Sequence, residues 1–372
     1  AVVVCMATTL DLCTGACKSP TTNMQTLPRW DLSHLYDAPT APALQADLDD
    51  AERRAKAFAE AYAGKLASLD SPAFAEAIAE FEAITEMLHM AMSYGQLLFA
   101  VSTSDSEVGR FYQTLNERVT QISSDTLFFT LEINRLDDRV LEEKLSDAEA
   151  ARYRPWLQEV REYRPHQLSD DMEKLLHEKS VTGRAAWVRL FEETFADMRF
   201  NVDGEGEGMT QSQVLNLMSD RDGTKRKAAA QALGAKLGDN VRLLALITNT
   251  LAKDKEIEDR WRHFDRPVSE RNLANQVEDE VVDALASSVR GAFADLSHRY
   301  YALKAKWFGV EALDYWDRNA PLPDDASALY TWDEARQLVL DAYGAFTPQM
   351  AEVAGRFFNE GWIDAEPREG KE

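Results

Sequence analysis

The stretch "SPAFAEAIAEFEAITEMLHMAM", residues 71–92, sets the structural pattern of this 372-residue chain. Apolar side chains recur in it at steps of three and four residues, which gathers them on one face of an α-helix. Ser71 followed by Pro72 is typical of an N-cap and a first helical position. We therefore predict a helix over 72–101 whose inner face holds Phe74, Ile78, Phe81, Thr85, Leu88 and Met92.

The segments on either side repeat this pattern. Residues 41–64 carry charged side chains on one face and a continuous apolar stripe on the other. The stretch "SEVGRFYQTLNERVTQISSDTLFFTLEINRL" continues the same spacing up to about residue 135. We predict that helices over 41–64, 72–101 and 104–135 form an antiparallel layer. The stripe of the first helix comprises Leu44, Leu48, Ala51, Ala55, Phe58 and Tyr62.

Helix-start signals recur further along the chain. Three pairs match the capping box, in which a hydroxyl residue is followed three positions later by Glu or Gln. Thr347 and Pro348 predict the start of the last helix, and Gly361 follows its expected end. The capping-box pairs are Ser146 with Glu149, Thr210 with Gln213, and Thr331 with Glu334.

A long late helix is predicted over 278–308. Its tail contains Arg299, Lys304 and Lys306, and cations suit the negative end of a helix. The apolar stripe of this helix comprises Val281, Leu285, Val289, Ala292, Leu296, Tyr300, Leu303 and Trp307.

One stretch departs from helical spacing. In "MRFNVDGEGEGMT", residues 198–210, apolar residues alternate and then give way to closely spaced glycines, which predicts a short β-hairpin between helices. A phosphate-binding loop is the sharper alternative. It is rejected because Glu205 and Glu207 would repel phosphate and no Lys-Ser/Thr pair follows.

Composition excludes several classes of partner. The formal charge is −23, from 64 acidic and 41 basic residues, and such a field repels nucleic acid and anionic membrane. No apolar run approaches membrane-spanning length. We therefore expect neither nucleic acid nor membrane as a partner.

The cysteines are confined to the start of the chain. Cys5, Cys13 and Cys17 have a spacing that fits no common metal motif, and no cysteine follows them. This usage suits a reducing, cytoplasmic compartment. Residues 1–26 make a poor signal peptide and are expected to be a disordered or spurious leader, with Met24 as a plausible start.

A zinc-protease motif is almost present in "LLHEKSVTG", residues 175–183. The H-E-x-x-H motif places two His one helical turn apart, but Val181 stands where the second His is needed after His177. The six His are at 34, 89, 166, 177, 263 and 298, and no two are three or four residues apart. We predict no zinc ligand and no catalytic residue in this chain, and His177 and Glu178 are expected to be surface residues of an ordinary helix.

Two other charged stretches have structural interpretations. "DLDDAERR", residues 47–54, is expected to be a solvated helix face rather than a cation site. "RWRHFDRP", residues 260–267, mixes basic and aromatic side chains, as nucleic-acid sites do. In so acidic a chain, a packing corner or a peptide-contacting surface is the better interpretation.

The stretch "RYYALKAKWFGVEALDYWDRNAPLP", residues 299–323, resembles the oligoendopeptidase F family of thimet-type zinc metallopeptidases. Further stretches in the same order resemble that family: "LPRWDLSHLY" (27–36), "LHEKSVTGRAAWVRLFEE" (176–193) and "FFNEGWIDAEPREGKE" (357–372). The residues of the first stretch that match the family pattern are Tyr300, Tyr301, Lys304, Asp317, Ala320, Pro321 and Leu322.

The resemblance implies a mostly α-helical, bowl-like fold that admits short oligopeptides, which a zinc-activated water hydrolyses. It further implies an N-terminal helical domain over 27–195 and the first part of a catalytic domain over 196–372. In the family the H-E-x-x-H helix follows the segment that resembles 357–372. We therefore expect a chain truncated before its zinc helix, inactive alone, with late helices (278–360) that expose apolar residues such as Trp307, Phe308, Phe346 and Phe357. Substrate-binding residues are not predicted.

A different class of function remains open. Helix after helix without a recognisable site also fits a non-catalytic α-helical interaction module. A nearby H-E-x-x-H helix in the same reading frame would favour the peptidase, and a natural stop would favour the module.

Overall fold

The computed structural model describes residues 27–323, 330–368 and 370–371. They divide into two compact units, each of which is described by itself. The layer unit comprises residues 32–194, 243–288 and 370–371; the hairpin unit comprises the remaining described residues. The predicted leader with Cys5, Cys13 and Cys17 lies outside the described residues, and the predicted domains 27–195 and 196–372 stay a prediction.

Every regular element that the structure describes in the layer unit is a helix. Within the described ranges, no helix combines the length and the apolar content needed to cross a membrane. Its elements are α1 (Pro42–Tyr62), η1 (Leu66–Ser68), α2 (Ser71–Ala100), α3 (Ser106–Ser124), α4 (Phe128–Arg135), α5 (Asp138–Lys144), α6 (Ala148–Ala151), α7 (Arg154–Glu162), η2 (Arg164–His166), α8 (Asp170–Lys179), α13 (Ser269–Ala274) and the larger parts of α9 (Arg184–Asp197), α12 (Val241–Trp261) and α14 (Asp279–Ala292).

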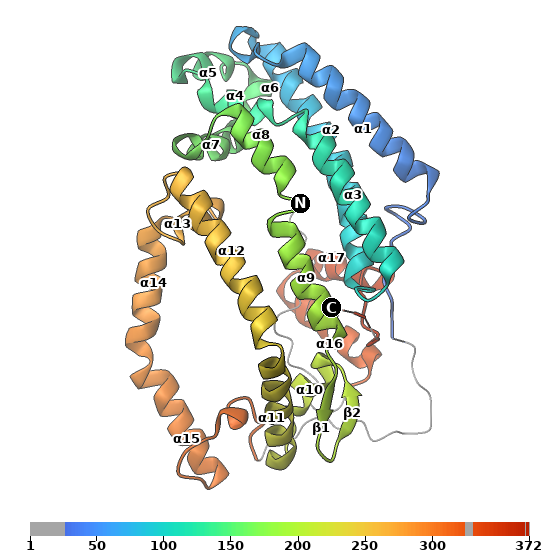
Figure 1. Cartoon of the computed structure of the whole chain (residues 1–372), viewed down its shortest axis with the longest axis vertical. Coiled ribbons are helices and arrows are strands. Elements are labelled where there is room, and N and C mark those ends of the chain that lie inside the picture. The colour runs from blue at the N-terminus through green and yellow to red at the C-terminus, as the bar shows by residue number, and fades with distance from the viewer. Residues whose placement is uncertain (1–26, 324–329, 369, 372) are drawn as a thin grey trace. The chain divides into compact units, whose positions relative to one another are not determined.

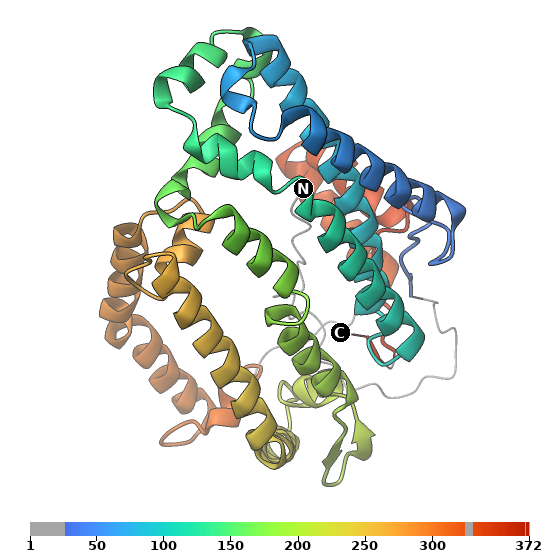
Figure 2. The same cartoon turned by 45° about the horizontal axis from the view of Figure 1, so that its top comes forward.

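The predicted layer is confirmed in α1, α2 and α3, which pack pairwise against one another (Figures 1 and 2). Five of the six stripe residues of α1 are buried, and in α2 the buried side chains include Phe74, Ile78 and Leu88. An aromatic cluster of Phe58, Phe81, Phe129 and Trp156 continues this core toward α4 and α7. Burial of the amphipathic faces against each other is what stabilises these helices.

The sequence prediction was wrong at three local points. The cap of α2 is Asp70, whose carboxylate accepts from Ala73 N, so Ser71 is already helical. The cap of α6 is Asp147 rather than Ser146. An Asp beside a Ser offers an ionised acceptor to the positive helix end, which explains both shifts by one residue.

The third error is the continuous helix over 104–135, which is instead broken between α3 and α4. The hydroxyls of Ser123 and Ser124 both donate to Thr120 O, and Thr126 Oγ1 donates to Ser123 O. Such local side-chain hydrogen bonds compete with the backbone hydrogen bonds of the helix, and the helix ends at this point.

The hairpin unit contains the predicted β-hairpin and several helices. Its elements are β1 (Phe200–Val202), β2 (Gly206–Met209), α10 (Gln211–Leu217), α11 (Gly223–Asp239), η3 (Ala294–His298, a π-helical segment), α15 (Arg299–Phe308), η4 (Tyr315–Asp317), α16 (Trp332–Phe346) and α17 (Pro348–Asn359), with the end of α9, the start of α12 and the end of α14.

The hairpin prediction is confirmed. β1 and β2 pair antiparallel, with Phe200 opposite Met209 and Val202 opposite Gly206. The turn between them passes through Gly204 at φ +79°, a left-handed conformation that glycine adopts without strain. Phe200 and Val202 are buried, and α11 packs against β1. The fold class, mostly α with a short two-stranded sheet, is therefore confirmed.

Capping signals in this unit were predicted well. Thr210 with Gln213 and Thr331 with Glu334 form complete capping boxes, and Thr347 caps α17. Gly361 follows the end of that helix at φ +69°.

The late helix predicted over 278–308 is α14, η3 and α15 in succession, with a π-type bond from His298 N to Phe293 O. The exposure expected of the late helices (278–360) is confirmed, since Trp307, Phe346 and Phe357 are 47%, 78% and 46% exposed. Phe308 is half-buried. Lys304 lies in the last turns of this helix as predicted, and it is buried.

Candidate functional site

The segment that matches the family pattern, 299–323, folds back on itself within the hairpin unit. α15 ends at Gly309, whose φ of +69° reverses the chain direction. The chain then returns through η4, which packs on α11. This return places Asp317 and Ala320 beside side chains of α11 and α15.

We call the folded-back segment 299–323, together with Arg226 of α11, the hook. Arg226 and Asp317 of η4 form its central ion pair. Arg226 Nε and Nη2 donate to Asp317 Oδ1 at 3.1 and 2.5 Å. The third guanidinium nitrogen, Nη1, donates to the carbonyls of Asp220 and Arg221 at 2.7 and 2.9 Å. Only 4% of the Arg226 side chain and 15% of the Asp317 side chain are exposed. The pair is thus largely removed from water and depends on these bonds.

Lys304 is the second buried cation of the hook. Its Nζ donates to the carbonyls of Arg318 and Ala320 at 2.8 and 2.6 Å. Burial lowers the pKa of Lys304, nearby Arg226 lowers it further, and Asp317 acts in the opposite direction. Both cations also lie over the ring of Phe308, at 5.7 Å for Lys304 and 5.8 Å for Arg226.

The arrangement gives the side chains of Lys304 and Asp317 a physical role. Lys304 ties α15 to the returning backbone, and Asp317 balances two buried cations. Three of the seven matched residues, Lys304, Asp317 and Ala320, thereby hold the geometry of the hook. Tyr300 and Tyr301 are exposed by 45% and 37% and lie on its outer surface. We interpret the hook as a positioning element and assign it no catalytic group.

Sequence reasoning missed Arg226. The signal was available: three and four positions after it come Ala229 and Ala230, both buried on the same face of α11. An Arg within an apolar helical stripe predicts a buried anionic partner, because an unpaired charge there would be costly. The identity of that partner, 91 positions away, could not be read from local spacing.

His177 lies on α8 and is half-buried. Its Nε2 lies 2.8 Å from Ser123 Oγ and 3.2 Å from Thr120 O, which attaches α8 to α3. Val181 is 8% exposed, so it is a packing residue. The prediction of an ordinary helix holds, although His177 contacts a neighbouring helix rather than lying free on the surface.

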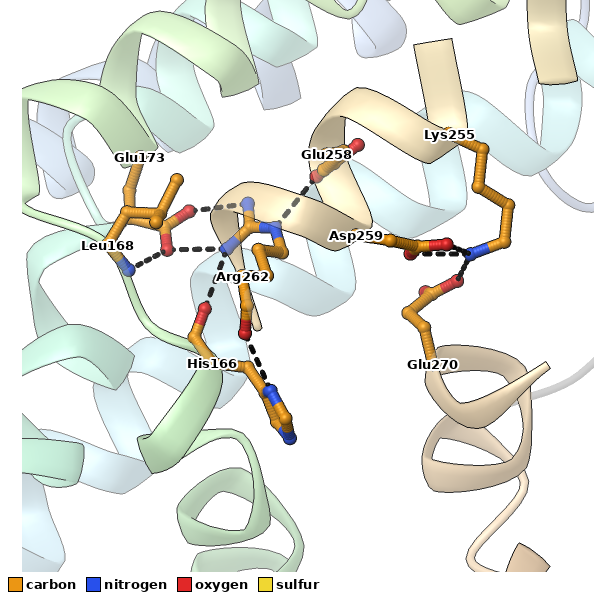
Figure 3. A network of polar contacts seen from close by, with 8 residues as sticks. All are labelled: His166, Leu168, Glu173, Lys255, Glu258, Asp259, Arg262 and Glu270. Atoms are coloured by element: carbon orange, nitrogen blue, oxygen red, sulfur yellow. Dashed lines mark hydrogen bonds and ion pairs between the residues drawn. The ribbon is translucent and has the colours of Figure 1, made fainter. Parts of the chain in front are cut away.

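The stretch 260–267 forms a packing corner, as predicted. Figure 3 shows Arg262 donating to both carboxylate oxygens of Glu173 at 2.7 and 2.9 Å and to Glu258 at 2.8 Å. His166 Nδ1 lies 2.8 Å from Arg262 O, and the His166 ring stacks on Phe264 with centroids 3.8 Å apart. These contacts join α8 and η2 to the end of α12 within the layer unit.

The other charged stretch, 47–54, is a helix face with ion pairs. Arg54 donates to both oxygens of Glu80 at 2.7 Å, and Asp49 pairs with Arg118. In the described part of the chain, no three His, Cys, Asp or Glu side chains gather as possible metal ligands.

Glu173 makes a pH-dependent contribution to this corner. Burial opposes its ionisation, but the Arg262 guanidinium and the Leu168 amide outweigh that effect and hold the pKa of Glu173 below its ordinary value. Because the folded-state pKa is depressed, the stabilisation is present at neutral pH and is lost as pH falls through the acidic range.

We expect Glu173→Gln to lower the free energy of unfolding by about 1.5–3 kcal/mol at neutral pH, the range for hydrogen bonds to charged groups. The gap between wild type and variant should shrink below about pH 4.5, where unfolded glutamate is protonated. Urea unfolding at neutral and acidic pH checks this, with Glu178→Gln on the exposed side of α8 as the matched control. A gap that is constant with pH contradicts the assignment.

Similarity to known proteins extends over most of the chain. A family model described as Oligopeptidase F matches residues 132–200. Over 320 residues the chain is 25% identical to Oligopeptidase PepF of Bacillus subtilis, and over 350 residues it is 26% identical to Group B oligopeptidase PepB of Streptococcus agalactiae. The chain is similar to oligoendopeptidase F proteins, and these matches support that family. The resemblance predicted from sequence is therefore confirmed.

The fold agrees with that of solved oligoendopeptidase F structures. The structure of oligoendopeptidase F from Enterococcus faecium matches with a TM-score of 0.68 at 19% identity, covering 88% of this chain and 69% of that one. One from Bacillus anthracis matches with a TM-score of 0.67 at 17% identity. The B. subtilis and S. agalactiae matches cover 47% and 57% of those relatives, so the chain spans about half the length of the curated relatives it matches.

Proposed function

We propose that this chain forms part of a zinc-dependent oligopeptidase that hydrolyses short peptides in the cytoplasm. The observation that carries the proposal is the similarity to Group B oligopeptidase PepB, which extends over 92% of this chain. The hook built from Lys304, Arg226 and Asp317 supports it, because two of its residues belong to the stretch that resembles the family. Zinc in such an enzyme would activate water for attack on the peptide carbonyl.

The described residues of this chain do not provide the set of ligands that a zinc ion needs. The described residues bring no three ligand-type side chains together, and the six His of the sequence include no pair at helical spacing. No step of peptide hydrolysis is therefore assigned to residues of this chain. Its proposed role is structural support for a site whose ligands come from elsewhere in the family's fold.

The purified chain is expected to hold substoichiometric zinc and to cleave no oligopeptide, because tight zinc binding needs three or four ligands in one place. Metal analysis after dialysis and mass spectrometry of a peptide mixture measure this, with B. subtilis Oligopeptidase PepF as the active control. Chelator-sensitive hydrolysis by the chain alone would overturn the assignment.

A chimera tests the family role directly. This chain would replace the matched 57% of S. agalactiae PepB, with the remainder of that enzyme left in place. We expect zinc-dependent cleavage of oligopeptides by the chimera. A folded, zinc-loaded chimera that cleaves nothing, while PepB is active in parallel, argues against the proposal.

The interaction module remains the second candidate, and the exposed apolar side chains of the late helices favour it. The two candidates differ in one measurement. A module would bind a partner protein and leave the chimera inactive, whereas the oligopeptidase role requires the chimera to be active.

A further inference from the structure

The hook contains a hollow between α15 and the returning chain. Its volume is about 430 Å³, and one wall is formed by Tyr301, Ala302 and Ala305 of α15. The opposite wall is formed by residues 311–315, which follow the chain reversal at Gly309. All of these residues belong to the hairpin unit. Both walls therefore come from the one segment that folds back on itself.

Buried contacts of the hook hold the two walls in place. The buried Lys304 donates through Nζ to Arg318 O at 2.8 Å, and Arg318 itself lines the hollow. Val310 N donates to Ala305 O at 3.0 Å, which fastens the start of the return to the end of α15. A site whose walls are already fixed costs a ligand little ordering free energy. The hollow is thus a preorganised feature of the hook.

The side chains around the hollow are small or aromatic. Three of the lining residues are alanines, whose short side chains leave room for an apolar group. Tyr301 and Tyr315 are 37% and 67% exposed. The Tyr315 ring packs edge-on against the Trp316 ring with centroids 4.8 Å apart, which restricts its movement. Tyrosine rings offer a large contact area and attract cations.

The charged groups of the hollow are Glu311, Asp314 and Arg318, and all three are exposed. None of their side chains has an ion-pair partner in the described part of the chain. Two carboxylates face one guanidinium, and the whole chain carries a net charge of −23. Both the local and the overall charge therefore favour a cationic ligand.

We propose that the hollow of the hook binds an organic ammonium group, of the kind that the N-terminus or a lysine side chain of a short peptide carries. The ammonium pairs with the carboxylates of Glu311 and Asp314, and the adjoining carbon skeleton contacts the alanines and the tyrosine rings. The choice of a peptide as the carrier rests on the proposed function. Binding of the ammonium itself requires no hydrolysis.

A ligand carboxylate is the competing choice, because Arg318 offers it a guanidinium. The two carboxylates that line the same hollow repel such a ligand, so the ammonium is favoured. The two choices predict opposite effects of removing the Arg318 charge.

The test is ligand-observed saturation-transfer NMR on the purified chain with three peptides, all amidated at the C-terminus. Tetraalanine with a free N-terminus is expected to bind, and N-acetylation should weaken its binding by about tenfold or more, because the charged group is lost. A third peptide, N-acetylated but with one lysine, distinguishes the carriers. If it binds, a lysine side chain serves as well, and if it does not, the N-terminus is the carrier.

Charge variants locate the site. E311Q/D314N should weaken binding of the free tetraalanine by about tenfold or more. The control D254N/E352Q makes the same change of net charge at exposed positions of α12 and α17 and should leave binding unchanged. R318Q should strengthen binding by about threefold, because it removes a like charge from the hollow. Opposite signs at Arg318 and at the two acids are not expected of residues that merely support the fold.

The proposal is wrong if the acetylated, lysine-free peptide binds as tightly as the free amine, or if R318Q weakens binding, which would identify a carboxylate site. It is also wrong if neither ammonium peptide binds at concentrations up to about 10 mM. An active chimera of PepB with a chain that binds no ammonium would refute this site alone. An inactive chimera with a chain that binds ammonium would refute the peptidase role alone.

Discussion

Replacing Asp317 by Ala is expected to destabilise the hairpin unit by about 3–5 kcal/mol, the cost of leaving a buried charge without its partner. Asp317 is the carboxylate bonded to Arg226, whose side chain is only 4% exposed. The neighbouring cation Lys304 is also buried, so the variant leaves two positive charges in a poorly solvated hook. The loss should appear as faster hydrogen exchange in α11 and α15, which the hook joins.

Two matched variants separate charge from packing. D317N keeps the shape and a neutral acceptor, so it should cost less than D317A. The double variant R226M/D317A removes both members of the pair and should be more stable than D317A alone, because no unpaired guanidinium is left in the hook. If D317A and R226M/D317A have equal stability, the pairing makes no contribution and the interpretation of the hook is wrong.

Local periodicity was a good guide to where helices lie. α1, α2, α16 and α17 were predicted closely because each has a 3.6-residue apolar pattern or a complete cap at its start. The predicted N-cap was wrong where two adjacent residues could each cap the same helix. Asp70 and Asp147 each displaced a neighbouring Ser, since an ionised carboxylate interacts more strongly with a helix N-terminus than a hydroxyl does.

The candidate site was harder to predict than the helices. Lys304 was predicted only as a cation at the negative end of a helix, and the structure shows its Nζ donating to the carbonyls of Arg318 and Ala320. Its role depends on a chain reversal at Gly309 and on Arg226 of α11, which is far away in sequence. Sequence similarity identified the matched stretch as distinctive, but only the tertiary contacts give Lys304, Asp317 and Ala320 a physical reason.

The break between α3 and α4 also has a consequence for stability, which F129A should reveal. Because the chain turns at residues 125–127, the Phe129 ring enters the core and is 0% exposed. It lies 5.1 Å from the ring of Phe58 and 5.0 Å from that of Phe81. Truncation to Ala removes these contacts and leaves a cavity, with an expected loss of about 3–5 kcal/mol.

The adjacent Phe128 provides the control, since it is only partly buried beside the same cluster. F128A should cost clearly less than F129A, because its site is partly open to water and less apolar surface is lost. Urea unfolding followed by far-UV circular dichroism measures both variants, and the fluorescence of Trp156 reports on the cluster itself. An equal loss for the two variants would mean that the helix break does not direct Phe129 into the core. Successive residues of a helix point about 100° apart, so Phe128 and Phe129 cannot both face the core to the same extent. A larger loss of stability for F129A than for F128A would show that Phe129 is the residue that faces the core.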